Sequence, residues 1–220
     1  MASENSDGTN HSVGLMLLLR HAATSNNTAT PPRLQGRRSD LSLSADGIAQ
    51  AARTAIYLAQ RPIHAVYSSP LLRAVETAQQ IAAPHGLTVE VLPDLIECDV
   101  GDWEGRDWVE IEKSEPEAFR QFVTDPASYP YAGGENLEQV RARVAPALDR
   151  LATSNLGRTI VVVAHNLVNR VYLAQHLGVP ISKARGINQD HCGLNLFRAG
   201  ERGVKLITLN AAFHLDGCPA

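Results

Sequence analysis

The sequence has few aromatic side chains and no long apolar run. Phenylalanine, tryptophan and tyrosine make up 5% of its 220 residues while hydrophobic residues reach 44%, so alanine and aliphatic side chains must supply most of a core. A length of this order fits one ordinary domain. No apolar run approaches the roughly 20 residues that a membrane-spanning helix needs. We therefore expect a single globular domain without a membrane partner.

Cysteine is scarce and scattered. Cys98, Cys192 and Cys218 contain no C-x-x-C pair, and their number is odd. This set argues against a disulfide framework and against a thiolate metal site. Free thiols are typical of a reducing compartment, so we expect a cytoplasmic protein.

Neither positive nor negative charge is in large excess. The net charge is −3, and basic and acidic residues are mixed along the chain. A nucleic acid or an anionic membrane would need a one-sided basic surface, so neither partner is expected. Residues 1–13 are polar and include Glu4 and Asp7, unlike a signal or transit peptide. We interpret them as a flexible tail.

What the sequence does contain is an alternation of apolar runs and helical patterns. The continuous apolar runs 14–19 and 159–164 predict strands that are buried on both faces. Further strands are expected at 63–67, 88–92, 194–198 and 204–209, and helices at 45–60, 69–81, 136–152 and 167–176. Strands that alternate with helices predict an α/β fold, a three-layer sandwich in which helices flank a mostly parallel central sheet.

The domain is expected to span residues 14–210, followed by a C-terminal tail at 211–220. Within it, residues 107–134 are rich in charge, proline and tyrosine. We interpret this stretch as a small helical insertion with one amphipathic helix around residues 110–122. It is placed to form a lid or a wall of a substrate site.

Charged residues directly follow the two clearest strands. Arg20 and His21 come after the first strand, and His165 comes after the strand at 159–164. In open α/β sheets, ligands bind outside the carboxyl ends of the strands. A histidine at a strand end is often structural, but here two strands present polar chemistry at the same predicted edge. That coincidence indicates a binding site.

A third strand leads into a helix that carries another arginine. Ser69 and Pro70 predict an N-cap and a first turn, and Arg73 follows in that helix. Arg73 alone could pair with Glu76 on the helix surface. Together, two histidines, two arginines and a helix N-terminus suit a phosphate dianion, because guanidinium groups match its oxygens and the helix adds N–H donors.

A series of motifs in order resembles the histidine phosphatase superfamily, also called the phosphoglycerate mutase-like family, over residues 15–209. The matching stretches are Arg20-His21-Ala22-Ala23-Thr24 followed by Asn27, Arg33-Leu34-Gln35-Gly36, Asp40, Leu43-Ser44, Gly47, SSPLLRAVETA at 68–78, LIECDVGDWEG at 95–105, Gly133-Gly134-Glu135 and VVVAHN at 161–166. Their order along one domain makes the resemblance specific.

The resemblance implies a phosphatase that needs no metal or other cofactor. His21 would take up the phosphoryl group, and Glu97 would protonate the leaving oxygen. Arg20, Arg73 and His165 would hold the phosphoryl oxygens. The residues that would bind the substrate from the edge of the site are Asn27, Gln35, Gly36 and Asn166. The expected partner is a small phosphate monoester, a sugar phosphate or a similar metabolite, and a homodimer stays open.

Two chemical alternatives remain at this point. Asp99 or Asp102 could replace Glu97 as the proton donor, since only the resemblance singles out Glu97. His21, His165 and Glu97 could also ligate zinc, because two imidazoles and a carboxylate suit that metal. The neighbouring arginines would repel a cation, which disfavours the zinc alternative.

Two functional alternatives also remain. Phosphoglycerate mutases of the same family carry a longer insertion with paired arginines. Here the interval is short, and the basic residues Arg106, Lys113 and Arg120 are scattered, which favours hydrolysis.

The other alternative is a non-catalytic module that binds a phosphorylated ligand on the same fold. The family pattern has glycine, an acidic residue and glycine where this chain has Ala22, Ala23 and Asn166. None of the three removes a catalytic group, so we expect an altered substrate fit rather than loss of activity.

Overall fold

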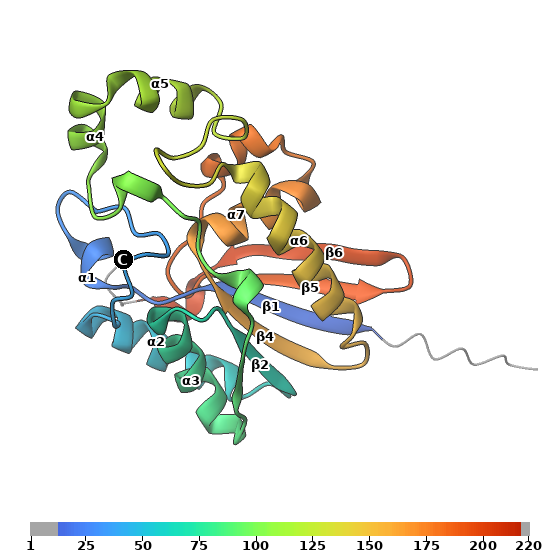
Figure 1. Ribbon diagram of the computed structural model, residues 1–220. Helices are drawn as coiled ribbons and strands as arrows, with labels where there is room; N and C mark the ends of the chain where they lie inside the picture. Colours follow the sequence, from blue (N-terminus) through green and yellow to red (C-terminus); the bar gives the residue numbers. More distant parts are fainter. Residues whose placement is uncertain (1–12, 217–220) are drawn as a thin grey trace, which may run out of the picture.

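A six-stranded sheet forms the middle layer of the molecule, as seen in the computed structural model, which describes residues 13–216 (Figure 1). The strand order is β3-β2-β4-β1-β5-β6. The strands are β1 (Gly14–Arg20), β2 (Ala65–Ser68), β3 (Val89–Val91), β4 (Thr159–Ala164), β5 (Leu194–Gly200) and β6 (Gly203–Ala211). The first four run parallel, and β5 and β6 are antiparallel to their neighbours. The predicted α/β fold with a mostly parallel sheet is confirmed.

Helices cover both faces of this sheet. They are α1 (Ser25–Thr28), α2 (Ala45–Leu58), α3 (Leu72–Ala82), α4 (Trp108–Ser114), α5 (Pro116–Thr124), α6 (Leu137–Thr153) and α7 (Asn166–Leu177). In Figure 1, α2 and α3 lie against one face, and α6 and α7 lie against the other. Helices α4 and α5 lie together at one end of the molecule, beyond the sheet.

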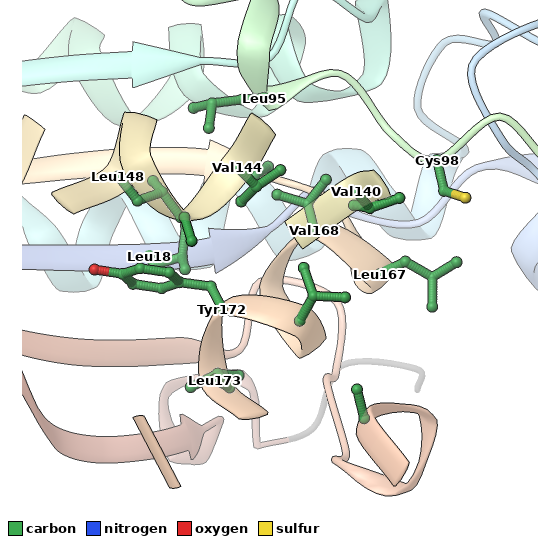
Figure 2. Packing of buried hydrophobic residues seen from close by; sticks show 14 of the residues in the cluster. Leu18, Leu95, Cys98, Val140, Val144, Leu148, Leu167, Val168, Tyr172 and Leu173 are labelled. Atoms are coloured by element: carbon green, nitrogen blue, oxygen red, sulfur yellow. The ribbon is translucent and has the colours of Figure 1, made fainter. Parts of the chain in front are cut away.

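The side chains of β1 divide between two cores, because successive residues of a strand point to opposite faces. Leu17 and Leu19 pack with residues of α2 and α3, whereas Leu18 packs with residues of α6 and α7. Figure 2 shows Leu18 beside Leu148 of α6 and Tyr172 of α7 in this second core. Burial on both faces explains the continuous apolar runs 14–19 of β1 and 160–164 of β4.

Two local predictions were wrong. Helix α3 begins at Leu72 rather than at residue 69, and its first N–H is capped by Asp40 Oδ1, 2.6 Å from the nitrogen of Leu72. The insertion holds two short helices rather than one amphipathic helix. Pro116 has no N–H to continue the first helix, and it occupies the first turn of the second.

The end of the described chain packs against α2. Residues Phe213–Leu215 form a 3-10 helix, in which the His214 ring stacks on Tyr57 with centroids 5.0 Å apart. The predicted C-terminal tail therefore has ordered contacts up to residue 216, and residues 217–220 lie outside the described residues. Most of the predicted N-terminal tail, residues 1–12, also lies outside them. Within residues 13–216, no helix is long and apolar enough to cross a membrane.

Candidate active site

The carboxyl ends of β1 and β4 bring two histidines together. Arg20 pairs with Ala164 in the parallel ladder, so the residues that follow lie at the same level of the sheet. The rings of His21 and His165 are 5.1 Å apart between centroids and tilted by 60°. The predicted meeting of the two strand ends is therefore seen in the structure.

The hydrogen bonds of His21 define its tautomer. Its Nδ1 lies 2.7 Å from the carbonyl oxygen of Ala22, and Arg73 Nε donates to its Nε2 over 3.2 Å. A guanidinium can only donate, so Nε2 holds the lone pair and Nδ1 carries the hydrogen. Burial, and then the charge of Arg73, holds the pKa of His21 well below its usual range. The ring is therefore neutral, with its lone pair on Nε2.

Arg73 is fixed behind this ring by the loop before α2. Its Nη1 donates to the carbonyl oxygen of Ser39 over 2.9 Å, and its Nη2 donates to that of Gly36 over 2.8 Å. The side chain is 1% exposed. Gly36 acts here through its backbone, and a Cβ at this position would lie 2.6 Å from the Cys98 carbonyl oxygen. The structure thus places Gly36 in support of Arg73 rather than in contact with the cavity.

Arg20 presents an unused donor at the site. Its Nη1 donates to the carbonyl oxygen of Gln189 over 2.8 Å, while its Nε is buried without a partner. Burial, followed by the charge of Arg170, lowers the pKa of Arg20 to about 10. The guanidinium is still protonated at neutral pH and available to an anion.

His165 is fully buried and hydrogen-bonded to Ser69. Its Nε2 lies 2.6 Å from Ser69 Oγ, which in turn accepts from the Leu71 nitrogen over 3.4 Å. Its other ring nitrogen, Nδ1, is buried without a partner among the described residues. Ser69, predicted as an N-cap, instead orients this imidazole.

Glu97 is the buried carboxyl of the site. Its Oε1 accepts from the Cys98 nitrogen over 2.9 Å, and its Oε2 accepts from the Leu167 nitrogen over 3.3 Å. Burial raises the pKa of Glu97 despite these two bonds and the charge of Arg73. The group therefore holds its proton to higher pH than an exposed glutamate does.

The two alternative carboxylates are engaged elsewhere. Burial would raise the pKa of Asp99, but hydrogen bonds from Gly101, Arg38 and Arg37 outweigh it and lower that pKa. The side chain of Asp102 is 71% exposed and lies 3.7 Å from Arg38 Nη1. Neither lines the cavity, whereas Glu97 does.

A cavity of about 360 Å³ opens in front of His21. The predicted site residues that line it are Arg20, His21, Asn27, Gln35, Glu97 and Asn166. Arg73 and His165 lie behind them, buried. Four buried side-chain atoms here have no hydrogen-bond partner among the described residues, namely Arg20 Nε, Gln35 Nε2, His165 Nδ1 and Asn166 Oδ1. Such groups are rare in folded proteins and indicate a polar ligand.

Thr24 arranges the two amides at the edge of the cavity. Its nitrogen donates to Asn27 Oδ1 over 3.0 Å, and its hydroxyl donates to Gln35 Oε1 over 2.8 Å. Both amide oxygens are therefore occupied. The buried Gln35 Nε2 remains as a donor that faces the site.

The geometry does not favour the zinc alternative. Within residues 13–216, no three histidine, cysteine, aspartate or glutamate side chains are placed to hold a metal ion. In addition, Arg73 donates to the lone pair of His21 that a metal would need.

The sequence reasoning missed a third histidine beside the site. His191 Nδ1 lies 3.0 Å from the His21 carbonyl oxygen, and the two ring centroids are 5.6 Å apart. Burial and the charge of Arg20 lower the pKa of His191 to about 3. This residue precedes β5, which is antiparallel to β1, so its loop lies at the carboxyl edge. No motif marks this position, and its place at the carboxyl edge depends on the direction of β5.

The insertion supplies one wall of the cavity. Asp107, Trp108 and Val109 at the start of α4 line it, together with Tyr131. Arg170 of α7 and Arg185 also line it. These arginines were also absent from the predicted site.

Comparisons with known proteins agree with this geometry. The sequence profile of the histidine phosphatase superfamily (branch 1) matches residues 16–212. The chain is 34% identical over 200 residues to phosphoserine phosphatase 1 of Hydrogenobacter thermophilus, covering 91% of this chain and 93% of that protein. It is 38% identical over 167 residues to the metal-independent phosphoserine phosphatase of Arabidopsis thaliana, covering 72% and 67%.

A solved structure is similar over nearly the whole chain. It is the phosphoserine phosphatase of Entamoeba histolytica in complex with 3-phosphoglyceric acid, with a TM-score of 0.81 and 26% identity. The match covers 92% of this chain and 99% of that one. On the profile match, these similarities and the two histidines at the strand ends, the chain belongs to branch 1 of the histidine phosphatase superfamily.

Proposed function

We propose that this protein hydrolyses a small phosphate monoester through a phosphohistidine on His21, with Glu97 as the proton donor and without a metal ion. One observation carries the proposal. The buried, neutral ring of His21 holds its lone pair on Nε2, in a cavity that it shares with the buried carboxyl of Glu97. A nucleophile and a proton donor thus occupy the same small space.

In the first step, Nε2 of His21 attacks phosphorus in line with the ester oxygen. The N–P bond forms while the P–O bond breaks, and the Glu97 carboxyl gives its proton to the leaving oxygen. The guanidinium of Arg73 keeps its two backbone bonds, and its Nε hydrogen bond passes from the imidazole to a phosphoryl oxygen, which frees the lone pair. Arg20 and the Nδ1 hydrogen of His165 bind the other oxygens and match their charge.

In the second step, water attacks the phosphohistidine. The Glu97 carboxylate takes a proton from this water, inorganic phosphate leaves, and both His21 and Glu97 return to their starting states. A carboxyl with a raised pKa suits both steps, because general acid–base catalysis is most efficient when the pKa lies near the working pH.

Donors at the edge of the cavity would orient the substrate. Gln35 Nε2 and Asn166 Oδ1 are a buried donor and a buried acceptor without partners, and Asn27 lies beside them. Two relatives are named for phosphoserine, and the similar solved structure holds 3-phosphoglyceric acid. Small phosphorylated acids are therefore suitable first substrates, alongside sugar phosphates.

The proposal is tested by the hydrolysis of p-nitrophenyl phosphate at pH 5–8 in excess EDTA. The wild type should turn over the substrate in the presence of the chelator, and His21→Ala should lose that turnover. Rapid quenching at alkaline pH, which preserves phosphohistidine, should trap phosphate on the wild type only. His64→Ala removes an exposed histidine as the matched control and should stay active. Activity that EDTA abolishes and zinc restores would contradict the proposal.

A further inference from the structure

The cavity carries more positive charge than the reacting phosphoryl group requires. Besides Arg20, its wall contains Arg33, Arg170 and Arg185. The acidic side chains of the wall are Glu97, which is the proposed proton donor, and Asp107. Four arginines thus share the cavity lining with two acidic side chains.

The additional arginines are not neutralised by the protein. Within residues 13–216, Arg170 and Arg185 have no ion pair, and neither does Arg33. By contrast, the nearby Arg106 forms ion pairs with both Glu110 and Glu115. Unpaired guanidinium groups that converge on one cavity are suited to bind an anionic ligand.

Arg170 of α7 uses one of its three side-chain nitrogens in a hydrogen bond to the protein. Its Nε donates to the carbonyl oxygen of Ile187 over 2.7 Å, and Nη1 and Nη2 have no partner among the described residues. Burial, followed by the neighbouring positive charge of Arg185, lowers the pKa of Arg170. Two like charges at a partly buried position cost free energy, and an anion between them would relieve that cost.

Arg185 is fixed by aromatic rings rather than by an acid. Its guanidinium carbon lies 4.5 Å from the ring centroid of Trp108 and 5.0 Å from that of Phe122. Stacking of this kind holds the plane of the group and leaves its N–H edge free for hydrogen bonds. Arg185 and Trp108 both line the cavity, so the fixed guanidinium forms part of its wall.

We propose that Arg170 and Arg185 form a second anion site, which binds a carboxylate or a second phosphate of the substrate while the phosphoryl group lies on His21. The inference rests on the proposed hydrolysis at His21 and specifies its substrate class. The substrate is a phosphate monoester that carries a second anionic group. Arg33, which is exposed and bonded to the Gly105 carbonyl oxygen, adds positive charge at the rim.

The test compares 3-phosphoglycerate with glycerol 3-phosphate, which differ by a carboxylate in place of a hydroxymethyl group. The wild type should prefer 3-phosphoglycerate by about tenfold or more in kcat/KM, and Arg185→Gln should reduce that preference by about 10- to 100-fold. Lys183→Gln removes the same charge from an exposed position of the same 3-10 helix and should preserve the preference. Propane-1,3-diol bisphosphate against its monophosphate shows whether a second phosphate is the preferred group.

A second measurement separates this inference from the proposed function. Calorimetric titration of His21→Ala with the same two esters measures binding without turnover. Tighter binding of 3-phosphoglycerate, lost in His21→Ala combined with Arg185→Gln, would support the second anion site even if the wild type hydrolyses neither ester. Equal binding of both esters, or an equal loss with Lys183→Gln, would overturn it. Hydrolysis of both esters at the same rate would also overturn it and leave the proposed function intact.

Discussion

At the scale of single residues, the contrast between Glu97 and its acidic neighbours separates the possible proton donors. Glu97 receives two backbone N–H bonds and still has a raised pKa, because burial outweighs them. Asp99 forms ion pairs with Arg37 and Arg38, and Asp102 is exposed. A raised pKa keeps a carboxyl protonated to higher pH, and a protonated carboxyl can donate to a leaving alkoxide. Burial therefore supports the proposed role of Glu97, in addition to the family motif.

We predict that Glu97→Gln affects substrates according to their leaving group. Hydrolysis of glycerol 3-phosphate should fall by about 10²–10⁴-fold, the usual contribution of general acid–base catalysis, because an alkoxide needs a proton to leave. Hydrolysis of p-nitrophenyl phosphate should fall far less, because p-nitrophenolate leaves without one. Both rates are measured as kcat at pH 6. An equal loss on the two esters, or the same pattern in Asp102→Asn, would contradict this role for Glu97.

The pH profile of the wild type should reflect the same carboxyl. The glycerol 3-phosphate rate is expected to fall as pH rises through the pKa of Glu97, which lies above the ordinary value of 4.5. The pKa of His21 is lowered, so its protonation should not limit the rate until the pH is well below 6.5. The fall in rate on the acid side of the pH profile is therefore expected only at low pH, for both glycerol 3-phosphate and p-nitrophenyl phosphate.

Which site residues the sequence could predict depends on strand direction. His21 and His165 follow parallel strands that are recognisable by their apolar runs, so their meeting at one edge follows from the topology. His191 precedes an antiparallel strand. It reaches the carboxyl edge of the sheet only because β5 runs in that direction, and the sequence of β5 does not show its direction. Arg170 and Arg185 reach the cavity from a helix and a 3-10 helix, through packing that no local pattern encodes.

At the scale of elements, α2 fixes the loop that follows the nucleophile. The backbone N–H of the N-cap Ser44 donates to the Ala23 carbonyl oxygen over 2.9 Å, and the Ser44 side chain accepts from the Gly47 nitrogen. Gly47 lies so close to this loop that a Cβ would be 2.0 Å from the Ala23 carbonyl oxygen. The first turn of α2 thus rests directly on the backbone beside His21.

We predict that Gly47→Ala lowers both stability and turnover. Replacing glycine with alanine inside a helix normally adds up to about 1 kcal/mol of stability. Here the methyl group would displace a backbone carbonyl, and overpacking of this kind typically costs about 1–3 kcal/mol. Urea denaturation and p-nitrophenyl phosphate assays measure the two effects. Gly200→Ala, where a Cβ would meet open space, is the control, and equal behaviour of the two variants would contradict the prediction.

Element boundaries were less predictable than the elements themselves. The start of α3 was misplaced because Ser69 resembles an N-cap, yet its hydroxyl bonds His165 and the cap comes from the distant Asp40. The two helices of the insertion were merged because the helical period continues across Pro116. The helix boundary is set by a tertiary contact in the first case and by a single proline in the second, and hydrophobic periodicity shows neither.

At the scale of the whole molecule, the order of strands and helices was predictable because apolar runs such as those of β1 and β4 alternate with helical patterns. The part of the cavity lining that Arg185 forms was not predictable. Arg185 packs there against Trp108 and Phe122 of the insertion, more than 60 residues away in the chain. Aromatic residues gather in this region, where the ring of Trp103 makes edge contacts with those of Trp108, Phe122 and Tyr131.

The site also determines how stability depends on pH, because three buried histidines meet there uncharged. Burial holds the pKa values of His21, His165 and His191 below the ordinary 6.5. As pH falls below 6.5, these histidines become protonated in the unfolded chain but stay neutral in the folded protein. The free energy of unfolding therefore falls. Each histidine contributes a slope of up to about 1.4 kcal/mol per pH unit. The raised pKa of Glu97 has the opposite sign but is a single group.

We therefore predict that urea denaturation between pH 7.5 and pH 5 shows a steep loss of stability on the acid side. His21→Ala should reduce the slope by up to about 1.4 kcal/mol per pH unit, whatever it does to stability at pH 7.5. The variant lacks one of the groups that binds a proton only in the unfolded state. His64→Ala, which removes an exposed histidine, should keep the wild-type slope. An unchanged slope in His21→Ala would mean that His21 takes up a proton in the folded state. The lone pair on which the phosphohistidine mechanism depends would then be blocked at acid pH, so this measurement of stability also tests the chemistry.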